Sequence, residues 1–162
     1  MTTSLTIRPA ELADAPALET LFEALDEHHR LALPDIFHPP RAERREQSWL
    51  AQRITGPDSA ILVASGLDRR IIGLAVLVTR SVAATVVRDA RRFVEIDELI
   101  VAAELRGLGV GRRLIEAARA WAQDRDIPGL EICAWSFNLE TIEFYRGIGF
   151  QPTVLRFAIA AE

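Results

Sequence analysis

The chain has 162 residues and a mass of 18.0 kDa, which fits one globular domain with a core of its own. Apolar residues make up 49% and charged residues 26%, a balance that excludes an intrinsically disordered chain. The net charge of −4 gives no sign of a nucleic-acid partner, and no apolar run approaches the ~18 residues of a membrane span. The first residues lack the basic and apolar regions of a signal peptide, so we expect a cytoplasmic protein without a membrane partner.

The scarcity of cysteine and the absence of lysine exclude several kinds of metal and catalytic site. Cys133 is the only cysteine, which excludes an internal disulfide and a cysteine-based zinc site, and we expect no metal. All 19 basic residues are arginines, so the chain has neither a Schiff-base lysine nor the lysine of a phosphate-binding P-loop. The three histidines, His28, His29 and His38, all lie in the first quarter of the chain.

The order of the predicted elements indicates a mixed α/β domain that spans residues 1–162. Short apolar runs predict strands at 5–9, 61–64, 71–78, 93–101, 130–134 and 154–160. Apolar residues at helical spacing and capping residues predict helices that start after Asp14, that end near Thr55, and that span 109–124 and 138–147.

The stretch from Val101 to Arg112 carries the clearest chemical signal. A strand ends, three glycines turn the backbone in Arg106-Gly-Leu-Gly-Val-Gly111, and a helix begins. Free backbone N–H groups and the positive end of the helix dipole meet at a helix start, and glycine lets a ligand approach the backbone closely. The arrangement predicts a phosphate or pyrophosphate site, although glycines often do no more than turn a loop.

Dinucleotide-binding folds offer a second interpretation of the same glycines. They require G-x-G-x-x-G directly after a strand and an acidic residue ~20 positions later. Glu131 imitates the distant acid, but Gly107, Gly109 and Gly111 form G-x-G-x-G, so the third glycine is misplaced. A nucleotide-dependent oxidoreductase therefore fits the spacing poorly.

Two motifs in this chain resemble the GNAT superfamily of acetyl-CoA-dependent N-acetyltransferases. The segment from Arg106 to Gly111 matches the Q/R-x-x-G-x-G/A signature, and residues 96–101 ahead of it resemble the family's fourth strand. Asn138, followed by Phe144-Tyr145 and by the glycine and phenylalanine at 149–150, resembles the second motif, N-x₅-F-Y-x-x-x-G-F.

The resemblance implies a central, mostly antiparallel twisted sheet of about seven strands with helices on both faces. It also implies that acetyl-CoA, the acetyl donor, lies in a V-shaped opening between the fourth and fifth strands, next to an amine acceptor. Dimers are common in the family, so a homodimer fits the resemblance as well. The cofactor-binding positions that it implies, mostly through the backbone, are Leu99, Ile100, Val101, Arg106, Gly107, Leu108, Gly109, Val110, Gly111, Arg112 and Asn138.

Tyr145, the only tyrosine, matches the position of the family's general acid. When an amine attacks a thioester, the leaving sulfur of CoA needs a proton, and a nearby phenol can supply it. The alternative is an aromatic core residue on a short helix, which is the interpretation that we favour for Phe144 and Phe150.

Attack also requires a neutral amine, and a lysine-like amine has a pKa of ~10.4, so a base is needed. Strand alternation puts Glu95 and Asp97 on one face with Leu99, and Glu98 on the other face with Ile100. We therefore expect Glu95 and Asp97 to serve as the base, whereas a bulge in the strand would shift the alternation and favour Glu98.

Each of these residues also has a purely structural interpretation. The acids could pair with nearby arginines such as Arg91 and Arg92. The histidines lie in the segment that walls the acceptor pocket in this family, but histidines at a helix end are more often surface residues than catalytic ones, and a surface position is the interpretation that we favour. Cys133 lies in an apolar run, so we expect it to be an inert core residue rather than a nucleophile.

We expect an N-acetyltransferase that transfers the acetyl group of acetyl-CoA to a primary amine of a small molecule or peptide, by direct attack in a ternary complex. The alternative is a non-catalytic acyl-CoA-binding or regulatory module of the same fold. Release of free thiol from acetyl-CoA in the presence of an amine distinguishes the two.

Overall fold

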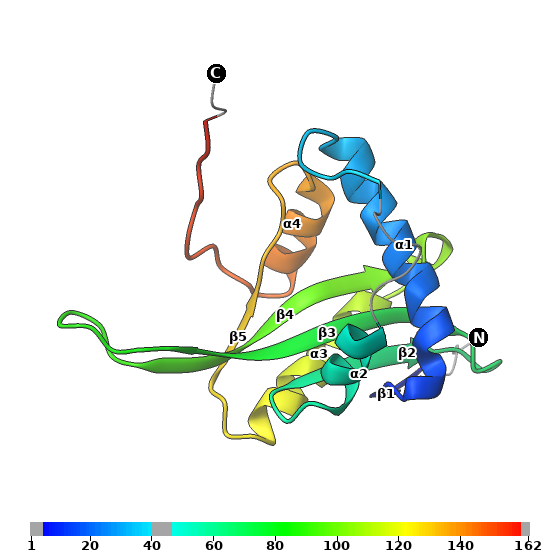
Figure 1. The fold of residues 1–162 in the computed structure, drawn as a ribbon, viewed down its shortest axis with the longest axis horizontal. Coiled ribbons are helices and arrows are strands. Elements are labelled where there is room, and N and C mark those ends of the chain that lie inside the picture. Colours follow the sequence, from blue (N-terminus) through cyan, green and yellow to red (C-terminus); the bar gives the residue numbers. More distant parts are fainter. Residues whose placement is uncertain (1–4, 40–46, 160–162) are drawn as a thin grey trace.

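A single sheet lies at the centre of residues 5–39 and 47–159, the part of the chain that the computed structural model describes (Figure 1). Its strands are β1 (Thr6–Pro9), β2 (Ser59–Ser65), β3 (Ile71–Val82), β4 (Arg91–Val101) and β5 (Gly129–Ile132), in that order across the sheet. Neighbouring strands are antiparallel, except β4 and β5, which are parallel. The predicted mixed α/β class and mostly antiparallel sheet are confirmed.

The described residues form five strands, so the prediction of about seven is wrong. Residues 154–159 of the strand predicted at 154–160 extend away from the sheet and form no backbone hydrogen bond with a described residue, and residue 160 lies outside the described part (Figure 1). A strand forms only where a neighbour satisfies its N–H and C=O groups, and the described chain places no neighbour beside this segment.

Helices cover both faces of the sheet, as predicted. One face carries α1 (Ala15–Ala32) and α2 (Gln47–Thr55), and the short helix η1 (Leu12–Asp14) precedes α1. The other face carries α3 (Val110–Gln123), which follows the short helix η2 (Ala103–Leu105). The last helix, α4 (Leu139–Gly147), follows β5 along the chain and appears between β5 and the end of α1 in Figure 1. No helix among the described residues is both long enough and apolar enough to cross a bilayer.

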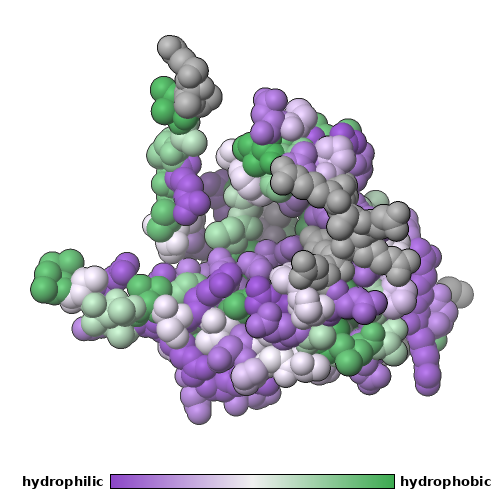
Figure 2. Space-filling view, in the orientation of Figure 1, coloured by the Kyte–Doolittle hydropathy of each residue, from purple (hydrophilic) through white to green (hydrophobic). Residues whose placement is uncertain are grey.

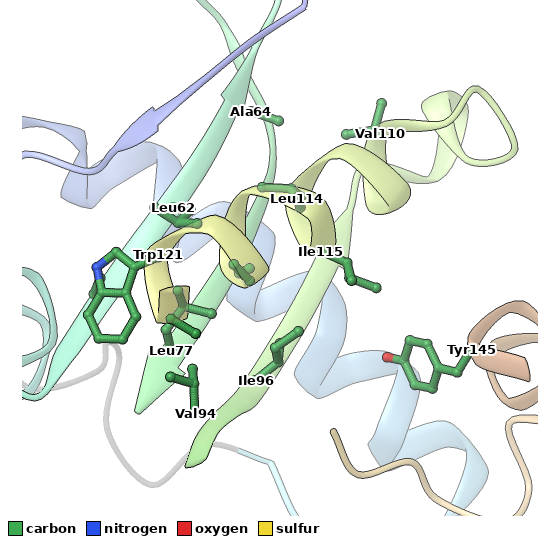
Figure 3. Close-up of a cluster of buried hydrophobic side chains, with 14 of the residues drawn as sticks. Leu62, Ala64, Leu77, Val94, Ile96, Val110, Leu114, Ile115, Trp121 and Tyr145 are labelled. Atoms are coloured by element: carbon green, nitrogen blue, oxygen red, sulfur yellow. The ribbon is translucent and has the colours of Figure 1, made fainter. Parts of the chain in front are cut away.

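Two buried apolar clusters hold these layers together. The α1-side cluster joins α1 and α2 to the sheet and includes Leu18, Phe22, Leu50, Val63, Leu74, Val76 and Ile100. The α3-side cluster lies on the opposite face (Figure 3) and includes Leu62, Leu77, Val94, Ile96, Val110, Leu114 and Tyr145. β2 and β3 contribute to both clusters, which explains why their sequences are apolar almost without alternation.

The helix ends that border the site follow from local capping. Gly109 precedes α3 with φ 84°, the left-handed conformation that glycine adopts without strain. Asn138, a predicted cofactor contact, caps α4, because its Oδ1 accepts a hydrogen bond from the backbone N–H of Thr141 at 3.4 Å. The left-handed glycine after α4 is Gly149, with φ 101°, while Gly147 is the last helical residue.

Candidate functional site

The two parallel strands at the sheet edge pair over only four positions. Phe93–Ile96 of β4 lies beside Gly129–Ile132 of β5. β4 then continues to Val101, whereas β5 ends and the chain turns toward α4. Along residues 97–101, β4 therefore has no described strand on its β5 side, and this open edge includes the predicted contacts Leu99 to Val101. An extended ligand can add to such an edge as a strand does.

A β-bulge lies where the two strands separate. In the pairing with β3, Ile96 lies opposite Leu77 and Glu98 lies opposite Val76, which leaves Asp97 as an extra residue. One extra residue reverses the alternation of every side chain that follows it. The two halves of β4 therefore alternate in opposite phase.

The predicted distribution of side chains is wrong beyond the bulge. Leu99 packs with the α3-side cluster rather than sharing a face with Glu95. Ile100 belongs to the α1-side cluster, and Glu98 lies opposite Val76 of that same cluster. Glu95 faces this side too, because it pairs opposite a residue of the α1-side cluster, Val78. In the sequence analysis, such a bulge is the feature that would favour Glu98. Glu98 is therefore a candidate base together with Glu95 and Asp97.

Arg80 of β3 holds the two predicted acids. Its Nε donates to Oε2 of Glu95 at 2.5 Å, and its Nη2 donates to Oδ1 of Asp97 at 3.4 Å. The hydrogen bond to Glu95 is the largest influence that raises the pKa of Arg80, so the guanidinium stays charged beside both carboxylates. Glu95 and Asp97 are thus brought together, on either side of one fixed positive charge.

The structural interpretation, that these acids pair with arginines, is confirmed, but their partner is Arg80 rather than Arg91 or Arg92. Arg91 donates to Glu131 of β5, and Arg92 donates to Asp58 at 3.2 Å. Sequence reasoning missed Arg80 because the residue lies 15 positions from Glu95, and only the β3–β4 register brings the two together.

Tyr145 is buried on α4, and its side chain extends from the helix with the hydroxyl at its outer end (Figure 3). Its ring contacts Phe144 and Phe150, with centroid separations of 5.6 and 5.8 Å. The hydroxyl forms no hydrogen bond with a described residue, so its proton remains available to a ligand. Burial, and to a smaller extent the Cys133 thiol, raises the pKa of Tyr145, so the phenol stays protonated at neutral pH.

Cys133 is exposed, so the prediction that it lies in the core is wrong. β5 ends at Ile132, one residue earlier, and Cys133 therefore lies where β4 and β5 separate. Its Sγ lies 3.8 Å from Oε1 of Glu95. Partial burial and then the Glu95 carboxylate raise the pKa of Cys133, the opposite of what an activated nucleophile needs.

The glycine-rich loop presents backbone N–H groups at the start of α3. Gly107 and Gly109 have φ angles of 75° and 84°, and a Cβ on either would meet no atom within 4 Å. Backbone conformation and open space, rather than packing, thus favour glycine at these positions. Leu108 between them is exposed, and in the described chain the N–H groups of residues 107–112 donate no backbone hydrogen bond. Such a loop fits an anionic phosphate.

Neighbouring residues fix the loop in place. Arg106 donates from Nε to the carbonyl oxygen of Val101 at 3.2 Å, which ties the loop to the end of β4. Gly111 lies against α4, because a Cβ there would be 3.3 Å from Cζ of Phe144. Arg112 is exposed and forms no ion pair with any residue that the structure describes, so its charge is available beside the loop.

The glycine loop, the open edge of β4 and Tyr145 lie at the positions where the resemblance to the GNAT superfamily put the cofactor contacts and the general acid. The model of the acetyltransferase (GNAT) family matches residues 20–150. The chain belongs to the GNAT acetyltransferase family. A comparison with curated proteins found no match.

Several solved structures share this GNAT fold. The BH1408 protein of Bacillus halodurans, in a mutant form, has a TM-score of 0.91 at 22% identity, over 97% of this chain and 99% of that one. Aminoglycoside N-acetyltransferase AAC(6')-Iy, in complex with CoA, has a TM-score of 0.77 at 18% identity, over 99% and 97% of the two chains. A putative acetyltransferase from Agrobacterium tumefaciens has a TM-score of 0.73 at 20% identity, over 96% and 99%.

An aromatic cluster joins α1 to the segment between β5 and α4 of this GNAT domain. It consists of His28, His29, Phe37, Trp135 and Phe137. His29 stacks on Phe37 with centroids 5.1 Å apart, and Trp135 meets Phe37 edge-on at 5.2 Å. Burial, and then the neighbouring His28, lowers the pKa of His29, which favours the neutral ring. The sequence directed attention to the histidines but not to Trp135 or Phe137, which lie about a hundred residues away.

The position of Cys133 can be tested with a thiol reagent such as Ellman's reagent. We expect the native protein to react to completion without denaturant, because the side chain is exposed. At mildly alkaline pH the reaction should be slower than in the unfolded chain, because the raised pKa of Cys133 lowers the thiolate fraction. Cys133→Ser supplies the baseline, and a native thiol that reacts only after unfolding would contradict the exposed position.

Proposed function

We propose that this GNAT domain transfers the acetyl group of acetyl-CoA to a primary amine of a small molecule or peptide, by direct attack in a ternary complex. One observation carries the proposal. Tyr145 packs in the α3-side cluster, whereas Glu95 faces the α1 side of the sheet and lies 3.8 Å from Cys133, the residue at which β4 and β5 separate. A proton donor and a proton acceptor thus flank one open strand edge.

The residues of the loop fit the anionic end of the donor. The N–H groups from Arg106 to Arg112 would hold the pyrophosphate, and the open edge at 99–101 would pair with the pantetheine arm. The carbonyl of Val101 already accepts a hydrogen bond from Arg106. Ala102 donates to Ile72 of β3, so Ile100, two residues earlier in the same antiparallel pairing, also turns its N–H and C=O toward β3. The polar groups of Leu99 and the N–H of Val101 therefore remain for that arm, and the predicted contact at Ile100 does not fit. These contacts use main chain, which is compatible with the side chain of Leu99 packing in the α3-side cluster.

The proposed reaction separates two proton transfers onto two residues. Acetyl-CoA supplies a thioester, whose carbonyl carbon bonds to the amine nitrogen while its bond to sulfur breaks. Glu95, with Asp97 beside it, accepts the proton that the amine loses, directly or through water. Tyr145 donates a proton to the departing sulfur, which leaves as the CoA thiol. Because burial keeps Tyr145 protonated, the donor form is present across the physiological pH range.

The aromatic cluster supports an acceptor with an amine group. Ring faces attract cations, so these side chains could hold an ammonium group before it loses its proton. Two structures that share the fold are described as aminoglycoside acetyltransferases, one of them in complex with sisomicin. A primary amine is the common element of these observations. A screen of amines for thiol release from acetyl-CoA tests the proposal, and CoA binding with no thiol release for any amine would favour the non-catalytic module.

Two substitutions at Gly109 test the loop. Gly109→Asp and Gly109→Asn add side chains of the same size, and both residue types tolerate the left-handed backbone at φ 84°. Only Asp adds a negative charge where the pyrophosphate would lie. We expect Gly109→Asp to bind CoA more than tenfold more weakly than Gly109→Asn by calorimetry. Equal affinities would show that the loop does not hold the anion.

Three variants identify the base. Glu95→Gln and Asp97→Asn keep the shapes of the side chains but remove their proton affinity, so we expect Glu95→Gln in particular to lower kcat by roughly 10²–10⁴-fold and to abolish the acidic limb of the pH–rate profile. If Glu98→Gln alone has this effect, Glu98 is the base and the assignment is wrong.

Two controls accompany these variants. Arg80→Gln breaks the ion pair with Glu95 but leaves the carboxylate in place, so it should keep the acidic limb. Glu104→Gln removes an exposed acid that pairs with Arg70 and should leave the rate unchanged. A loss in Arg80→Gln as large as that in Glu95→Gln would mean that the ion pair, not proton acceptance, supports activity.

Tyr145→Phe tests the proton donor. The substitution keeps the ring that packs against Phe144 and Phe150 and removes only the oxygen, so stability and CoA affinity should be nearly unchanged. We expect the single-turnover rate to fall by roughly 10- to 100-fold, because a thiol with a pKa of ~8.5 is a tolerable leaving group without assistance. A wild-type rate would return Tyr145 to a packing role.

A further inference from the structure

The aromatic cluster lies on the same side of the sheet as Glu95, the proposed base. His28 and His29 belong to the end of α1, the helix that covers the face toward which Glu95 is directed. Cys133, whose Sγ is 3.8 Å from Oε1 of Glu95, precedes Trp135 by two residues. Two residues of extended chain span at most ~7 Å, so the cluster begins close to the carboxylate that would accept the proton of the amine.

The backbone around Trp135 is fixed by a turn. The N–H of Asn138 donates to the carbonyl oxygen of Trp135 at 3.0 Å, and Asn138 then caps α4, the helix that carries Tyr145. The ring of Trp135 meets Phe37 edge-on, and Phe37 in turn stacks on His29. Two segments thus hold Trp135 in place, yet 42% of the residue remains exposed and accessible to a ligand.

Aliphatic side chains border the aromatic cluster. Ile36, next to Phe37, is 57% exposed, and Leu139, two residues after Phe137, is 67% exposed. The space-filling view shows hydrophobic side chains over the end of α1 and the start of α4 (Figure 2). Aromatic rings attract both cations and other rings, whereas aliphatic side chains gain only from burying apolar surface. The combination favours an uncharged ring over a second ammonium group.

We propose that the acceptor is a primary amine with an aromatic ring a few bonds from its nitrogen, and that Trp135, Phe37 and Phe137 bind this ring. This assignment rests on the proposed function, in which the nitrogen lies at Glu95. With the nitrogen there, the aromatic cluster is left to contact the remainder of the acceptor. A ring at that distance packs edge-on or offset against the exposed part of Trp135, in the geometries that aromatic pairs prefer. Trp135 would therefore distinguish ring-bearing amines from aliphatic ones.

Three probe amines test the acceptor class. 2-Phenylethylamine carries a ring, propylamine has a methyl group in place of that ring, and 1,4-diaminobutane has a second ammonium group. Thiol release from acetyl-CoA measures the rate with each of them. We expect kcat/KM for 2-phenylethylamine to exceed the values for the other two at least about tenfold, because the burial of one ring is worth at least that factor.

Substitutions at Trp135 test the ring contact. Trp135→Ala should lower the preference for 2-phenylethylamine over propylamine at least about fivefold, whereas Trp135→Phe retains a ring and should keep most of the preference. Leu12→Ala is the control. Leu12 is 58% exposed just before α1, whereas the aromatic cluster lies at the other end of this 18-residue helix, so the control should keep the wild-type preference. Thermal unfolding followed by circular dichroism verifies that all three variants are folded.

Binding of the ring can be measured without acetyl transfer. In saturation-transfer NMR of 2-phenylethylamine with the CoA-loaded protein, we expect the strongest signals on the ring protons, and we expect Trp135→Ala to lose them. Binding of the ring that depends on Trp135, with no thiol release for any amine, would overturn the proposed function but keep the ring site.

Two outcomes would overturn the acceptor assignment while the proposed function stands. The first is acetyl transfer to propylamine or 1,4-diaminobutane with a kcat/KM equal to or above that for 2-phenylethylamine. The second is a preference for the ring that Trp135→Ala retains, which would place the ring elsewhere. Absence of both thiol release and ring binding would overturn the assignment and the proposed function together.

Discussion

β4 pairs with β5 only as far as Ile96 because the next residue, Asp97, is an extra residue in the pairing with β3, and a bulge bends and twists its strand. Beyond this point β4 still pairs with β3 on one side, so it is held in the sheet while its other edge is open. The free N–H and C=O groups of this edge can pair with an extended ligand as they would with a strand. The same bulge reverses the alternation of the strand and directs Glu98 toward the face that Glu95 already occupies.

In the proposed mechanism, the two proton transfers are made from opposite faces of the sheet. Tyr145 belongs to the α3-side cluster, where burial keeps its proton in place. The carboxylates lie on the other side, where Arg80 is fixed to both Glu95 and Asp97. A donor and an acceptor placed side by side would exchange their proton directly. Because the two groups lie on opposite faces of the sheet, each would act on a different atom of the reacting groups.

The sequence predicted the elements that have a local cause. The glycine loop, the start of α3 and the Asn138 cap depend on residues within one turn of one another, and each was found where it was expected. Features that depend on pairing between strands were not predictable in the same way. The alternation beyond Ile96 depends on a single extra residue, and Arg80 reaches Glu95 only through the register of β3 and β4. Cys133 was misplaced because β5 ends one residue earlier than its apolar run.

The strand predicted at the C-terminus was wrong for a different reason. Leu155, Phe157 and Ile159 alternate as they would in a strand. A strand forms only beside another strand, however, and the sequence of a segment does not show whether such a neighbour is present. β5 itself borders the candidate site. Its short pairing with β4 sets where the two strands separate, and Cys133, just after its end, has its Sγ 3.8 Å from Oε1 of Glu95. Four residues of sheet pairing thus fix the place at which the edge of β4 opens, so the position of the candidate site depends on β5 as well as on the bulge in β4.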